Sequence, residues 1–133
     1  MYDNQGDYPK ALELYHKALA IDEKVLGLEH LSTATSYNNI ALVYNEQGDY
    51  PKALELYHKA LVIREKVLGL EHPDIAMTYN SMAHVYYNQG DYLKALKMLQ
   101  KALAIYKKLL GTEHPHTINV IEGIKIVQAW LSS

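Results

Sequence analysis

One fifteen-residue stretch of this chain, QGDYPKALELYHKAL, occupies residues 5–19 and recurs without change at residues 47–61. A diverged copy, QGDYLKALKMLQKAL, occupies residues 89–103, so each copy begins 42 residues after the one before it. Self-similarity at a fixed period of about 20–50 residues is the signature of a repeat architecture, in which each copy is one unit stacked on the next. The repeated stretch therefore decides the class of fold.

Six of the seven glycines follow a finer spacing within this period. They stand 21 residues apart, at Gly6, Gly27, Gly48, Gly69, Gly90 and Gly111. Glycine is favoured just beyond the end of a helix, where φ turns positive. The spacing therefore predicts six helix ends, two in each 42-residue unit.

The segments between the glycines have the apolar period of amphipathic helices. Asp49 is placed to act as an N-cap, and Pro51 falls in the first turn, where its missing N–H costs little. We expect a stub at residues 1–5 and helices at 8–26, 33–47, 50–68, 75–89, 92–110 and 116–131. Since no helix pair buries its apolar face alone, the pairs must stack. The predicted fold class is all-α, an α-solenoid of antiparallel helix pairs.

A pattern of small and aromatic residues recurs in the two full copies. It reads Ala34, Tyr37, Ile40, Ala41, Tyr44, Gly48, Asp49, Tyr50, Ala53, Tyr57, Ala60 and Leu61, and then Ala76, Tyr79, Met82, Ala83, Tyr86, Gly90, Asp91, Tyr92, Ala95, Leu99, Ala102 and Leu103. This pattern resembles the tetratricopeptide repeat (TPR), and its 42-residue period and G-x-E-H-P turn are similar to the kinesin-light-chain subtype. The resemblance implies one TPR array over residues 1–133. It comprises a truncated first repeat at 1–30, repeats at 31–72 and 73–114, and a terminal helix at 115–133.

The resemblance also implies that the first helix of each repeat lines a concave groove for a protein or peptide partner. An asparagine in such a groove offers both a donor and an acceptor to the backbone of an extended peptide. The expected groove residues are Asn38, Leu42, Asn45, Met77, Asn80, His84, Tyr87 and Asn88. The alternative is that Asn38 and Asn39 only cap or bridge neighbouring helices. The stripe contains no lysine or arginine, so basic or apolar peptides are favoured over acidic ones.

Self-association is a second hypothesis for function. Helix 8–26 starts without the helix that precedes it in a full repeat. This would leave about four large side chains uncovered, at a cost of about 1.5–3 kcal/mol each; the candidates are Leu12, Tyr15, Leu19, Ile21 and Leu26. The last helix is apolar around much of its circumference. We therefore expect a homo-oligomer with an interface at Leu12, Tyr15, Leu19, Ile126 and Trp130. A closed dimer is favoured over a head-to-tail polymer, and an engineered array without an evolved ligand is a further alternative.

Composition and motifs argue against other classes of function. The net charge is −2, which favours neither nucleic acid nor an anionic membrane as a partner. No apolar run is long enough to span a bilayer and the first residues contain no apolar leader, so we expect a cytoplasmic protein. No Ser/His/Asp order, acid pair or phosphate-binding loop is present. We expect no catalysis and no cofactor.

The repeated Glu-His pairs at residues 29–30, 71–72 and 113–114 raise the question of a metal site. Equivalent residues of stacked helices lie about 10 Å apart. Zinc requires its ligands about 2 Å from one centre. We therefore interpret these pairs as features of the turns and expect no metal.

Overall fold

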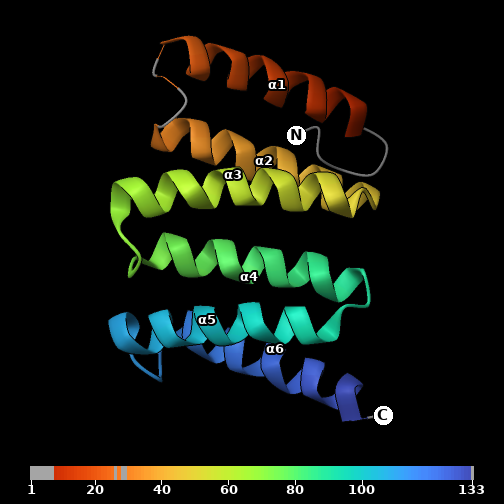
Figure 1. The fold of residues 1–133 in the computed structure, drawn as a ribbon, viewed down its shortest axis with the longest axis vertical. Helices are drawn as coiled ribbons and strands as arrows, with labels where there is room; N and C mark the ends of the chain where they lie inside the picture. Colours follow the sequence, from red (N-terminus) through yellow and green to blue (C-terminus); the bar gives the residue numbers. More distant parts are fainter. Residues whose placement is uncertain (1–7, 26, 28–29, 133) are drawn as a thin grey trace. The chain divides into compact units, whose positions relative to one another are not determined.

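The computed structural model describes residues 8–25, 27 and 30–132 of the chain. This part contains six α-helices and no strand (Figure 1): α1 (Tyr8–Val25), α2 (Leu31–Gln47), α3 (Tyr50–Leu68), α4 (Pro73–Asn88), α5 (Tyr92–Leu110) and α6 (Pro115–Ser132). All six predicted helices are present, with ends within two residues of those expected. The stub expected at residues 1–5, Gly6 and Leu26 lie outside the described residues.

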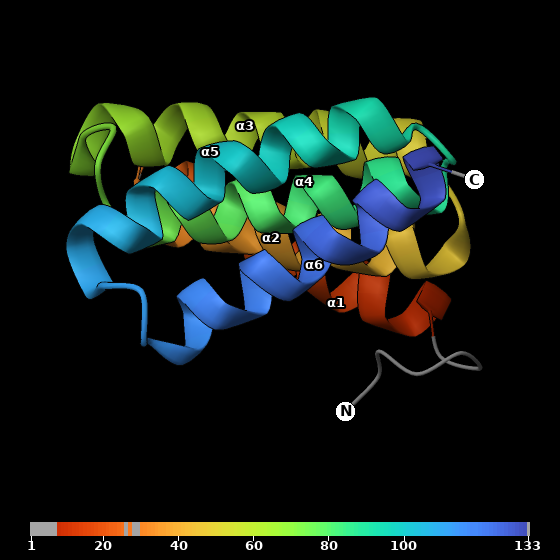
Figure 2. The ribbon, with the colours of Figure 1, turned by 90° about the horizontal axis from the view of Figure 1, so that it is seen from below.

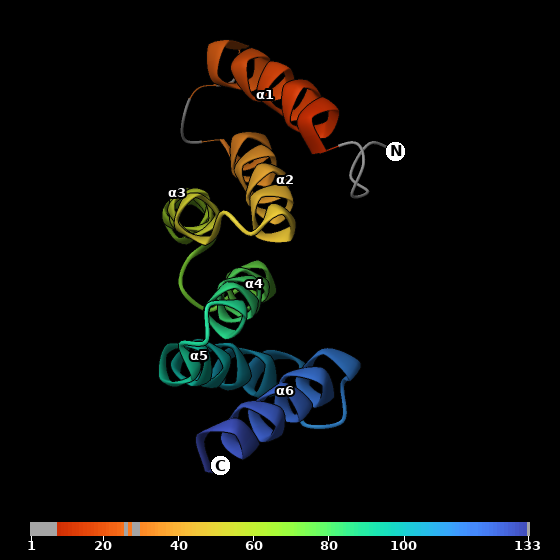
Figure 3. The same ribbon diagram turned by 90° about the vertical axis from the view of Figure 1, so that its right-hand side faces the viewer.

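The chain divides into two compact units, of which the first comprises residues 1–67. Within it, α2 lies against both α1 and α3 (Figures 1 and 3). Its core contains one or more buried side chains from each of the three helices: Leu19, Ala34, Tyr37, Ile40, Ala60 and Ile63. The apolar faces predicted from the helical period thus meet in one cluster.

The second unit comprises residues 68–133. Here α5 lies against both α4 and α6 (Figure 2). The core contains Ala76, Ala83, Ala95, Leu99, Ala102, Tyr106, Val120 and Val127. The small residues of the repeat are fully buried in both units, since Ala34, Ala60, Ala95 and Ala102 have no exposed surface. An alanine leaves room for a neighbouring helix to approach, as the sequence pattern predicts.

The helix ends coincide with the evenly spaced glycines. All five of these glycines that the structure describes have positive φ, between 81° and 96°. At Gly48, with φ 88° and ψ 8°, the amide donates to Asn45 O, and the next amide, of Asp49, donates to Tyr44 O at 2.9 Å. A residue with a Cβ is disfavoured in this left-handed conformation. The prediction of glycine-terminated helices is therefore confirmed for these five positions.

The residues that begin the helices were predicted only in part. The Oδ1 atom of Asp49 accepts from Lys52 N at 3.4 Å, as expected for an N-cap. Before α2, α4 and α6, however, the cap is a histidine. The Nδ1 atom of His30 accepts from Ser32 N at 3.0 Å, and His72 and His114 form the same bond two residues onward at 3.0 and 3.1 Å.

These histidine caps explain why the sequence placed the starts of α2, α4 and α6 too late. Because His30 and His72 cap the chain directly, α2 and α4 begin two residues earlier than expected, and Pro73 is the first residue of α4. Within the described residues, no group of three or more His, Asp or Glu side chains is placed to hold a metal ion. The capping bonds of His30, His72 and His114 give these histidines a structural role at the turns.

The expectation that Leu12, Tyr15 and Leu19 lie uncovered is wrong. Leu19 is buried, and Leu12 and Tyr15 are partly buried against the core cluster of the first unit. The reason is that α2, which follows α1 in the chain, covers this face. Ile21 is exposed, as expected, and the other exposed large apolar side chains of α1 are Leu14 and Val25.

Two partly buried hydrogen bonds join α1 to α2. The Tyr37 hydroxyl donates to Glu23 Oε2 at 2.8 Å, and the Ser36 hydroxyl donates to Asp22 Oδ2 at 2.9 Å. Burial of the ring, and then its bond to the Glu23 carboxylate, raise the pKa of Tyr37 to about 12. Both effects favour the neutral phenol over the phenolate.

Candidate functional site

A cavity of about 240 Å³ lies among α4, α5 and α6 of the second unit. Its buried side is apolar and is formed by Ala83, Leu99 and Val127. Gly123 of α6 also lines it, and a Cβ added there would lie 3.5 Å from a methyl group of Leu99. The missing side chain at Gly123 therefore leaves the space above Leu99 open.

The open side of the cavity is polar and aromatic. Asn80, His84 and Tyr87 of α4 line this side, and they lie on one face of the helix because they are spaced by three or four residues. From α6 the same side receives Asn119, Glu122 and Ile126. Three of the predicted groove residues thus line one cavity together with residues of the last helix. Met77 and Asn88 are exposed on α4, but they do not line the cavity.

An aromatic cluster borders the cavity through Tyr87. The Trp130 Nε1–H group donates to the Tyr87 hydroxyl at 2.7 Å. The Trp130 ring also stacks on Tyr92 at a centroid distance of 5.7 Å, and Tyr92 lies 5.4 Å from Tyr87. These contacts join the end of α6 to α4 and to the start of α5. Sequence reasoning missed this role of Trp130, because its partners lie 43 and 38 residues earlier in the chain.

The interface assigned to the last helix stays a prediction. Ile126 is 53% exposed and Trp130 is 52% exposed. Both side chains therefore offer apolar surface to solvent, although Trp130 already contacts Tyr87 and Tyr92. Ile126 in addition lines the cavity.

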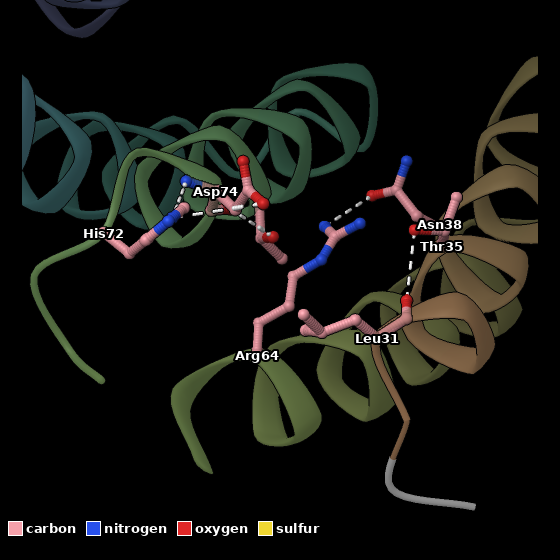
Figure 4. Close-up of polar contacts among 7 residues, drawn as sticks. Leu31, Thr35, Asn38, Arg64, His72 and Asp74 are labelled. Carbon is pink, nitrogen blue, oxygen red and sulfur yellow. Dashed lines mark hydrogen bonds and ion pairs between the residues drawn. The ribbon is translucent and has the colours of Figure 1, made fainter. Parts of the chain in front are cut away.

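The predicted groove residues of the first unit lie in a different environment. Asn38 is half-buried, and its Oδ1 atom accepts from Arg64 Nη1 at 3.5 Å (Figure 4). Arg64 is only 5% exposed. Asn38 therefore bridges α2 to α3, as the alternative interpretation of this residue proposed. Leu42 is 43% exposed and Asn45 is half-buried.

A signal for the Arg64 contact was present in the near-identical copies. Residues 5–30 and 47–72 differ at only two positions, and one of them places Arg64 where the first copy has Asp22. Asp22 accepts from Ser36, whereas Arg64 donates to Asn38. Asp22 of α1 therefore bonds to the helix that follows it, whereas Arg64 of α3 bonds to the helix that precedes it. The Thr35 hydroxyl is also occupied, since it donates to Leu31 O at 3.1 Å (Figure 4).

The family follows from a match along the chain. The tetratricopeptide repeat model matches residues 1–66, 32–108 and 74–129. This chain belongs to the tetratricopeptide repeat family. The fold is typical of a non-catalytic scaffold for protein–protein interaction.

Solved structures support the same assignment. The TPR-like repeats of a Podosopora anserina protein, described as a kinesin light chain with nearly identical repeats, are 29% identical with a TM-score of 0.84, covering 95% of this chain and 60% of that one. BtubC (BKLC) from P. vanneervenii is 25% identical with a TM-score of 0.78, covering 99% and 61%. The predicted TPR solenoid, similar to kinesin-light-chain repeats, is confirmed.

One curated relative matches a shorter stretch. The Clustered mitochondria protein of Arabidopsis thaliana is 51% identical over 39 residues, which are 29% of this chain and 3% of that protein. The chain thus spans about three fifths of the two solved chains and a small part of this relative. None of the helices described in this chain is long and apolar enough to cross a bilayer.

Proposed function

We propose that this TPR chain is a non-catalytic scaffold that binds an extended peptide segment of a partner protein. The observation that supports the proposal best is the cavity among α4, α5 and α6. Three residues predicted to line a peptide groove, Asn80, His84 and Tyr87, surround it. Ligand sites are typically concave and mostly apolar, with a few polar groups that fix orientation.

The two sides of the cavity suit different parts of a peptide. The apolar surface of Leu99 and Val127 can take one side chain out of water. The half-buried amide of Asn80 offers a donor and an acceptor, which match the C=O and N–H groups of an extended backbone. Asn80 differs here from Asn38, whose carbonyl oxygen already accepts from Arg64. We therefore place the main peptide contact in the second unit.

The test is a selection of peptides from a random display library on the wild-type protein, followed by titration of an enriched peptide. Replacing Asn80 by alanine is expected to weaken binding about tenfold, which is about 1.4 kcal/mol. Trp130, the only tryptophan of the chain, reports binding through its fluorescence. Gln100→Ala removes an exposed amide from α5 and serves as the control. Equal affinity of the Asn80→Ala variant, or no enriched peptide, would contradict the proposal.

Self-association is the second proposed function, and exposed apolar side chains of α6 favour it. Ile118, Ile126, Trp130 and Leu131 are between 40% and 53% exposed. We expect light scattering coupled to size exclusion to show a mass above 15.1 kDa as concentration rises. Ile126→Lys should restore the monomer, because a charge in an apolar interface is costly. A mass of one chain over a hundredfold range of concentration would contradict self-association.

A further inference from the structure

The charge around the cavity has one sign. Among the described residues that line it, Glu122 alone is charged when histidine is counted as neutral. The Glu122 side chain is exposed, and within the described part of the chain it forms no ion pair with a lysine or arginine. Its charge is therefore available to a cation on a bound peptide.

Aromatic rings add to this preference. Tyr87 lines the cavity, and the faces of aromatic rings attract cations. The chain itself uses this contact repeatedly. In the second unit, the Lys94 ammonium lies 5.7 Å from the centre of the Tyr86 ring, and the Lys101 ammonium lies 5.4 Å from that of Tyr79. A lysine beside a tyrosine of α4 is thus already a recurring arrangement in this fold.

The buried side of the cavity suits the remainder of such a side chain. Lysine and arginine have apolar stems that pack on apolar surface while the charged head stays near water. Leu99 and Val127 supply that surface, and Gly123 leaves the space in front of Leu99 open. Glu122 is next to Gly123 in the sequence and is exposed, so the charge lies at the open side.

We propose that this cavity selects a lysine or arginine side chain of the bound peptide. The proposal rests on the proposed peptide-binding function and specifies its ligand. The stem packs on Leu99 beside Gly123, and the cationic head lies at the open side with Glu122 and the ring of Tyr87. An acidic side chain is disfavoured there by the Glu122 carboxylate, and an uncharged apolar side chain gains the packing without the charge interaction.

Three matched peptides of the form acetyl-Ala-Ala-X-Ala-Ala-amide test the selection, with lysine, norleucine or glutamate at X. Binding is followed by NMR through the indole N–H of Trp130 and the amide of Gly123. At low ionic strength, the lysine peptide is expected to bind about threefold to fivefold more tightly than the norleucine peptide, as for an exposed charge pair. The glutamate peptide is expected to bind most weakly, and added salt should reduce the difference.

A charge reversal identifies the residue responsible. Glu122→Lys is expected to invert the order, so that the glutamate peptide binds more tightly than the lysine peptide. Glu113→Lys makes the same change of net charge at an exposed residue outside the cavity, and it should leave the order unchanged. The same order in the Glu122→Lys variant as in the wild type overturns the proposal.

Peptide binding and the selection of a cation can fail separately in this experiment. Equal binding of the lysine and norleucine peptides overturns the selection of a cation but leaves peptide binding intact. If no peptide shifts the Trp130 or Gly123 resonances at millimolar concentration, and the display selection also yields none, both the selection and the proposed function are wrong.

Discussion

Replacing Leu99 by alanine is expected to lower the free energy of unfolding by about 2–5 kcal/mol. Leu99 is 5% exposed and belongs to the core cluster that joins α4, α5 and α6. Its side chain also separates that core from the adjacent cavity. Removing it would enlarge an existing empty space, so we place the cost in the upper half of this range.

Urea denaturation measures the loss, and the same helix supplies a matched control. Leu93 lies in the first turn of α5 and is 63% exposed. Leu93→Ala makes the same chemical change without opening a buried space, so it should alter stability by less than about 0.5 kcal/mol. Similar losses in the two variants would show that Leu99 is not part of a packed core.

Amide hydrogen exchange can locate the effect of the Leu99 substitution. In a repeat protein, each unit contacts mainly its neighbours, so local stability need not be uniform. Leu99 packs with α4 and α6. We therefore expect exchange to accelerate more in α4, α5 and α6 than in α1 and α2.

The stability of the first unit should depend on pH through Tyr37. The pKa of Tyr37 is raised from 10.0 to about 12 in the folded chain, so the folded state keeps this proton more tightly than the unfolded state does. The resulting stabilisation is complete below pH 10 and is lost as pH rises toward 12. By linkage, it amounts to about 1–3 kcal/mol.

The variant Tyr37→Phe tests this dependence. It should lower stability near pH 8 by about 1–2 kcal/mol, because the bond to Glu23 is lost. It should also flatten the decline between pH 10 and pH 12, since position 37 no longer titrates. Denaturation curves at several alkaline pH values give both results. If the two proteins differ by the same amount at pH 8 and at pH 12, the pKa of Tyr37 is not raised by folding.

The features that could be predicted from the sequence are those set by local backbone chemistry. The glycine spacing located the helix ends because a positive φ at Gly48 and its equivalents is a property of that residue type. The apolar period located the helices for a similar reason. The starts of α2 and α4 were missed by two residues because a histidine ring is not among the usual caps.

Features set by long-range packing were harder to predict. The face of α1 at Leu19 was expected to be free because only the preceding helix was considered, whereas α2 covers it. The stripe of Asn80, His84 and Tyr87 was predicted from the family resemblance and the helical spacing, but the different environment of Asn38 was not. That difference depends on Arg64, which comes from another helix and is 26 residues away in sequence.

The matching turns affect how such a chain can gain or lose repeats during evolution. Gly48 and Gly90 stand 42 residues apart and have φ angles of 88° and 81°. The residue after each glycine, Asp49 or Asp91, donates an equivalent backbone hydrogen bond of 2.9 Å. A segment excised or inserted between two such equivalent joints leaves ends of matching geometry. Gain or loss of whole 42-residue repeats by recombination therefore requires no new type of turn.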